Sequence, residues 1–166
     1  LGFFDTLVTF QITATDTAYN ESVVAEASFT LDTKTPGDIR SLVMKNLTVE
    51  IEDAGYSNDV TRLEWLAPSA ADADSYAVYY KLDDGAYSAL AAGINDLFYT
   101  VPVGVTATDG EITFKVTSMD EAGNESAGII SEFTLDTVAP VFTVTYVNNN
   151  TSNVTAIDGN TLNFVE

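Results

Sequence analysis

Hydrophobic and polar residues alternate along much of this chain. Alternation with a period of two predicts β-strands that each turn one face toward a core, because successive side chains of a strand point to opposite faces. Turn signals such as Asp83-Asp84-Gly85 separate the alternating runs, and no helical stripe of useful length occurs. The sequence therefore predicts an all-β fold, most simply a sandwich of antiparallel sheets. The predicted strands cover residues 47–52, 62–65, 76–82, 112–117 and 129–135.

One stretch of sequence occurs twice, at an offset of 104 residues. Residues 9–36 align without gaps with residues 113–140, and 14 of the 28 paired positions are identical. Such a repeat indicates tandem structural units, and this length is ordinary for a sandwich domain. We therefore expect three pieces. They are the C-terminal strands of one domain in residues 1–35, a complete domain in 36–139 and the N-terminal strands of another in 140–166.

The two outer pieces cannot bury their apolar faces alone, because an isolated pair of strands is marginal in water. Residues such as Phe10 and Phe29 would be exposed. The strands that would cover these faces have two possible sources. They belong to residues elsewhere in a longer chain, which is the simpler expectation, or to neighbouring copies that add strands at open edges. The second source would make the chain the subunit of a filament.

Charge and composition narrow the function. The chain has 25 acidic and 6 basic residues and a formal net charge of −19, which disfavours nucleic acids and anionic membrane surfaces as partners. The absence of Cys and His excludes disulfides, zinc fingers and histidine acid–base chemistry. No apolar run is long enough to insert in a membrane. No nucleophile motif, phosphate loop or metal-hydrolase spacing occurs, so we expect no enzyme. The excess of acidic residues is consistent with general solvation, with adaptation to high salt or with the binding of divalent cations.

Two sets of residues resemble known families. The first is Pro36, Leu63-Glu64-Trp65 with Pro68, Tyr76-Ala77-Val78-Tyr79-Tyr80 and the 112–116 strand. With this set the middle piece resembles a fibronectin type III domain, an immunoglobulin-like sandwich. That resemblance implies that Trp65 packs in the core, and Ile112 stands where the family's corner Tyr is expected.

The second set is Asp120-Glu121-Ala122-Gly123-Asn124-Glu125-Ser126 with Asp136-Thr137 and Pro140. It resembles the signature of bacterial immunoglobulin-like repeats. Those repeats build adhesins, S-layer proteins and other secreted multidomain proteins, which implies an extracellular location at the cell surface. Several of these families bind calcium at domain junctions.

The repeated turn also offers oxygen ligands for Ca²⁺, which takes six to eight of them from carboxylates, amides, carbonyls and water. If the turn and the end of the last strand lie at the same pole of a domain, their oxygens would converge there. The alternative is that these residues only form turns and cap a strand. Tyr19 replaces the turn glycine in the first copy, which predicts a different turn or a weaker site. The candidate ligands are Asp120, Asn124, Glu125 and Asp136 in one copy, and Asp16, Asn20, Glu21 and Asp32 in the other.

Asn-x-Ser/Thr triplets are a further candidate site, because they accept glycans in secreted proteins. Asn20 and Asn124 lie in such triplets, but they cannot readily be both glycosylated and ligands. The remaining candidates for glycosylation are Asn46, Asn149, Asn150 and Asn153.

We therefore expect a structural or adhesive element of an extracellular surface protein, as part of a stalk, S-layer or filament stiffened by Ca²⁺. Its partners would be neighbouring domains or copies, with a glycan or cell-surface ligand as a further candidate. A filament subunit joined by strand exchange is one alternative. A spacer or carbohydrate-binding module of a secreted enzyme is the other, with Tyr79, Tyr87 and Tyr99 as candidate sugar-binding aromatics.

Overall fold

The computed structural model describes residues 6–141, 154–158 and 161–164, and within them the chain forms strands and no helix. Accordingly, no helix suited to crossing a membrane occurs in these stretches. The alternating sequence pattern explains the class, since each run places apolar side chains on one face. The strands are β1 Thr6–Ile12, β2 Ala25–Leu31, β3 Ser41–Asn46, β4 Val49–Ile51, β5 Gly55–Ser57, β6 Arg62–Leu66, β7 Ser75–Leu82, β8 Ser88–Ile94, β9 Phe98–Thr100, β10 Gly110–Met119, β11 Ile129–Leu135, β12 Val154–Asp158 and β13 Thr161–Phe164.

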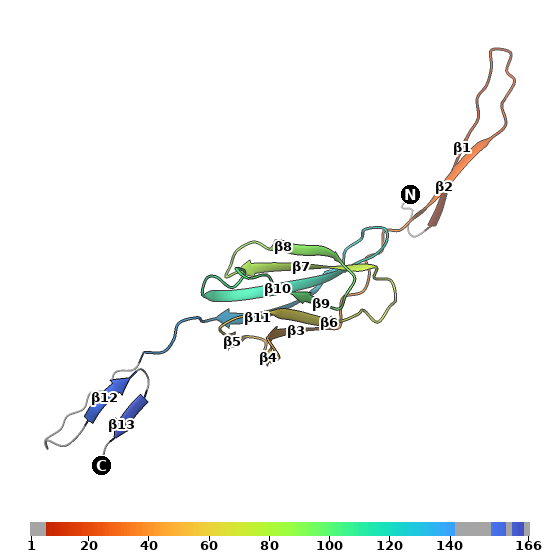
Figure 1. The fold of residues 1–166 in the computed structure, drawn as a ribbon. Helices are drawn as coiled ribbons and strands as arrows, with labels where there is room; N and C mark the ends of the chain where they lie inside the picture. The colour runs from red at the N-terminus through yellow and green to blue at the C-terminus, as the bar shows by residue number, and fades with distance from the viewer. Residues whose placement is uncertain (1–5, 142–153, 159–160, 165–166) are drawn as a thin grey trace.

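Strands β3 to β11 form two sheets that enclose one core (Figure 1). One sheet has the order β4-β3-β6-β9 and the other has the order β5-β11-β10-β7-β8. The prediction of an all-β sandwich is confirmed. The pairing departs from a purely antiparallel one at a single place in this unit, where β5 runs parallel to β11. The chain leaves the edge strand β4 and crosses to the edge of the other sheet, which gives β5 the direction of β11.

The core lies between the sheets and contains the apolar positions of the predicted alternation, although the intervening Thr113 and Thr117 of β10 are buried as well. Ile112, Phe114 and Val116 of β10 have no exposed surface, and Trp65 of β6 is 3% exposed. The Trp65 ring meets the ring of Tyr76 edge-on, with 5.5 Å between centroids. Burial of each such side chain stabilises the fold by about 1.5–3 kcal/mol. The core position that the family resemblance implied for Trp65 is therefore confirmed.

The predicted strand 47–52 is interrupted at its start. Leu47 has a φ of 55° and lies 75% exposed in the turn that joins β3 to β4. Its backbone N–H donates to the hydroxyl of Thr61. A positive φ takes Leu47 out of the extended conformation, so the pairing of β4 with β3 begins only at Val49.

Strands β1 and β2 form a separate two-stranded sheet, shown in Figure 1 beyond one end of the sandwich. Its register repeats that of β10 and β11 at the same offset of 104 as the sequence: Phe10 pairs with Ala27 as Phe114 pairs with Ser131. Burial differs completely. Phe10 and Phe29 are 61% and 49% exposed and stack on each other, whereas Phe114 and Phe133 have no exposed surface. Strand β1 lacks the neighbour that β7 provides for β10.

Candidate functional site

The loop between β10 and β11 contains a turn built by one carboxylate. Asp120 Oδ1 accepts a hydrogen bond from the backbone N–H of Asn124 at 2.8 Å, and Asp120 Oδ2 accepts one from Asn124 Nδ2 at 2.9 Å. The backbone N–H of Gly123 donates to the carbonyl of Asp120 at 3.1 Å, and Gly123 has a φ of 88°. The side-chain bond from Asn124 is the first of the contacts that lower the pKa of Asp120.

The loop between β1 and β2 contains the same turn. Asp16 Oδ1 and Oδ2 accept from the backbone N–H and from Nδ2 of Asn20, each at 2.9 Å. Of the two alternatives expected for Tyr19, a different turn is wrong, because Tyr19 takes a φ of 67° and fills the place of Gly123, whereas a weaker site stays a prediction. Its side chain is 91% exposed, so the strained backbone meets no steric conflict in the interior. Bonds from Asn20 lower the pKa of Asp16 as they do in the second copy.

The glutamates that follow the two turns bind their own hairpins. Glu125 Oε1 accepts from the hydroxyl of Thr117 at 2.6 Å and from the hydroxyl of Tyr79 at 2.8 Å. Glu21 Oε1 accepts from the hydroxyl of Thr13 at 2.6 Å. Desolvation, followed by the bond to the Glu125 carboxylate, raises the pKa of Tyr79. These glutamates therefore clamp the base of each loop.

The strand ends do not meet the turns of their own hairpins. Asp32 follows Leu31, which pairs with Thr6, while the Asp16 turn lies beyond the other end of β1. The length of a hairpin, about 20 Å at 3.3 Å per residue, separates the two sets. The condition for convergence, that the turn and the strand end lie at the same pole of one domain, is therefore not met. Asp32 and Asp136 instead accept through Oδ1 from the backbone N–H two residues later, each at 3.0 Å.

The turn of one hairpin meets the strand end of the other. Asn124 Nδ2 donates to the main-chain carbonyl of Asp32 at 3.2 Å. A hollow of about 370 Å³ between the two parts is lined by Thr30, Asp32, Glu121 and Ala122. Within the described part of the chain, no three Asp, Glu, His or Cys side chains are grouped so that they could hold a metal ion. Calcium binding by the turn residues stays a prediction.

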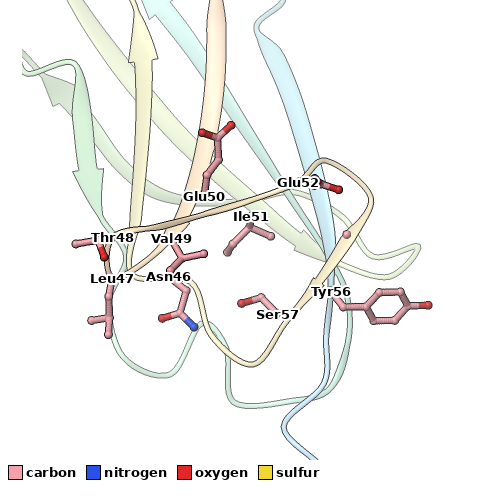
Figure 2. A pocket seen from close by; sticks show the side chains of 10 residues that line it. Asn46, Leu47, Thr48, Val49, Glu50, Ile51, Glu52, Tyr56 and Ser57 are labelled. Atoms are coloured by element: carbon pink, nitrogen blue, oxygen red, sulfur yellow. The ribbon is translucent and has the colours of Figure 1, made fainter.

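A second hollow, of about 530 Å³, lies beside the edge strands β4 and β5 (Figure 2). In Figure 2, Ile51 and Ser57 face the space between the two segments, while Tyr56 points away from it. Leu47, Val49 and Tyr56 are exposed around it. Asn46, one of the glycosylation candidates, lies here and donates through Nδ2 to Asn58 Oδ1 at 2.8 Å. Asn149, Asn150 and Asn153 lie outside the described residues.

The aromatic candidates for sugar binding do not form one platform. Tyr79 is half-buried and tied to Glu125, and Tyr99 packs against the core. Tyr87 is 39% exposed. Lys115 Nζ lies 4.9 Å from the ring centroid of Tyr79 and 5.2 Å from that of Tyr87, so a cation occupies the space between these rings.

Sequence reasoning missed two sets of contacts. Asp53 Oδ1 accepts from the backbone N–H of Glu132 at 2.9 Å and from the hydroxyl of Ser131 at 2.7 Å, which fastens the β4–β5 turn to β11. The contact of Asn124 with Asp32 joins the sandwich to the end of the first hairpin, across the linker that connects them. Both join residues that are far apart in sequence, and no local pattern marks such pairs. The repeated Asp-x-x-x-Asn spacing was the one available signal.

No protein-family model matches this chain, and no curated protein matches it. Among solved structures it is similar to an Fn3-like protein from Clostridium thermocellum, with 23% identity and a TM-score of 0.43 over 62% of this chain and 94% of that one. It is also similar to a β-1,2-glucanase from Parabacteroides distasonis, with 20% identity and a TM-score of 0.39 over 74% of this chain. That match spans only 16% of the glucanase chain.

Proposed function

We propose that this chain is part of a tandem array of fibronectin type III-like sandwiches that serves as a structural or adhesive element of an extracellular surface protein. The observation that carries the proposal is the second hairpin. Strands β1 and β2 repeat the register, the turn and the bonded glutamate of β10 and β11, yet they lack the strands that would cover them. A closing hairpin without its sandwich is most simply the end of a preceding unit.

The role of such an array is mechanical. A hairpin alone is marginal in water, so its apolar face requires the remaining strands of its own unit. The net charge of −19 keeps neighbouring units and neighbouring molecules apart. In this proposal, divalent cations that bind near the acidic turns reduce that repulsion and stiffen the array. No catalytic step is required of any residue.

The location is tested on intact cells of the organism that encodes the chain. An antibody raised against the purified chain is expected to label the surface of unpermeabilised cells. It is also expected to detect a band far larger than the 17.8 kDa of this chain. Labelling that appears only after permeabilisation would refute the surface location. A cellular band near the mass of this chain alone would refute the tandem array.

Filament formation by strand exchange is a second candidate, favoured by the exposed face of β1 and β2. Their outer edges are unpaired in the described sheet, so strands of a second copy could pair there. Electron microscopy and size-exclusion chromatography of the purified chain separate the two candidates. Fibres that elongate with concentration indicate a filament subunit, and stable monomers indicate a segment of an array.

A further inference from the structure

We propose that the β10–β11 loop is an interdomain clamp that grips the strand end and linker of the preceding unit and sets the angle between units. This inference rests on the proposed tandem array and names the contact that joins its members. The partner is a strand end recognised through the main-chain carbonyl of its Asp32 position and followed by a short linker. Its side chains contribute little, so the clamp suits any unit that ends in the same backbone geometry.

The first part of the clamp is the second hydrogen of the Asn124 amide. One Nδ2 hydrogen is used inside the turn, on Asp120 Oδ2, and the other reaches the carbonyl of Asp32 at 3.2 Å. The equivalent Asn20 makes only the bond inside its turn, to Asp16 Oδ2, among the contacts of the described residues. The two turns have the same internal hydrogen bonds. The turn of Asn124 differs from the turn of Asn20 in its additional contact with the strand end at Asp32.

The second part of the clamp lies at the other end of the linker. The hydroxyl of Ser118 donates to the carbonyl of Gly37 at 2.5 Å, and the backbone N–H of Gly128 donates to Asp38 Oδ1 at 2.6 Å. Ser118 and Gly128 flank the turn that carries Asn124. The β10–β11 loop and the adjoining end of β10 therefore hold the chain both before and after the linker residues 33–36.

One hydrogen bond across the joint, from Asn124 to Asp32, suffices because the linker keeps the partners close, while the bonds to Gly37 and Asp38 fix the end of the linker on the sandwich itself. A short connection gives the second binding event a high effective concentration, so weak contacts can order the joint. The net contribution of one hydrogen bond shifts the equilibrium between a docked and an undocked joint about two- to tenfold. The first hairpin has Asn20 but carries Ala14 where the second has Ser118, so a joint formed by its loop would lack the hydroxyl anchor.

The test measures the distance between two labels, one on each side of the joint, in the full chain, because a fixed angle between units fixes this distance. The chain has no Cys, so the substitutions Ser28→Cys and Ser88→Cys at two exposed positions give a unique pair of spin labels, one on each side of the joint. Pulsed electron paramagnetic resonance is expected to give one narrow distance distribution. Asn124→Ala should broaden it, and adding Ser118→Ala should broaden it further.

Asn20→Ala is the matched control, because it removes the same bond inside the turn without touching the joint. It should leave the distribution narrow, and a thermal melt of each variant checks that the sandwich remains folded. Equal distributions for Asn124→Ala and Asn20→Ala would overturn the clamp. That result would leave the tandem array intact, because the array is judged by whether added strands protect the first hairpin.

Discussion

The two equivalent phenylalanines of the repeated hairpin should have very different effects on stability. Phe114 has no exposed surface and packs in the core of the sandwich, whereas Phe10 is 61% exposed on the first hairpin. Phe→Ala in a core costs about 3–5 kcal/mol, since it removes transfer free energy and leaves a cavity. The free energy of unfolding of a domain is about 5–15 kcal/mol, so Phe114→Ala removes a large share of it.

Phe10→Ala should change the free energy of unfolding of the sandwich by less than about 0.5 kcal/mol, as is usual for surface substitutions. Among the described residues it stacks on Phe29, at 6.0 Å between ring centroids, and this pair lies outside the core cluster. The prediction therefore contrasts two substitutions with the same chemistry, the same strand register and opposite burial.

Urea unfolding followed by tryptophan fluorescence measures the difference. The chain has one Trp, and it lies buried in the core of the sandwich, so the signal reports this unit alone. With a slope of about 1.5 kcal/mol per M of urea, Phe114→Ala should lower the midpoint by about 2 to 3 M. Equal shifts for the two variants, or a larger shift for Phe10→Ala, would refute the assignment of the core.

The substitution of Gly128, the substitution of Asp53 and the removal of Ca²⁺ should each lower the melting temperature. Gly128→Ala should lower the melting temperature, because Gly128 has a φ of 82° and an added Cβ would lie 2.7 Å from the carbonyl oxygen of Val116; an unchanged melt would contradict this local geometry. The backbone N–H of Glu132, followed by the hydroxyl of Ser131, lowers the pKa of Asp53. The stability that Asp53 contributes is therefore complete above the unfolded carboxylate pKa of about 3.9 and is lost as pH falls through the lower folded value. Asp53→Ala should thus lower the melting temperature at pH 7, and the gap to the parent should narrow as the pH falls below about 4; a gap independent of pH would count against this role. Finally, calcium stiffening predicts that a chelator lowers the melting temperature by several degrees, and identical melts with chelator and with added Ca²⁺ would remove calcium from the proposal.

Local patterns in the sequence predicted the strands well where burial and alternation agree. The run from Tyr76 to Leu82 forms β7, and its alternate residues Tyr76 and Val78 lie in the core as expected. The pattern failed at Leu47, because alternation cannot reveal a positive φ at a turn. The parallel pairing of β5 with β11 was also missed, because it depends on a crossing between sheets.

The candidate site was predicted in part. The repeated Asp-x-x-x-Asn spacing identified the two turns, and the structure gives them the same hydrogen bonds. The distance between a turn and the strand end of the same hairpin follows from the strand register, which the sequence alone did not provide. The contact between Asn124 and Asp32 depends on how the linker folds back, so it could be found only in three dimensions.

Strands β1 and β2 are expected to close a sandwich like the one in the middle of the chain. A copy of residues 36–104 placed directly before Leu1 would restore the 104-residue spacing and supply equivalents of strands β3 to β9. Hydrogen exchange of the β1 and β2 amides in this extended chain is the direct measurement. Their protection is expected to rise toward that of β10 and β11, and Phe10→Ala is then expected to reduce it. Exchange as fast as in the original chain, with no effect of Phe10→Ala, would show that β1 and β2 do not close such a sandwich.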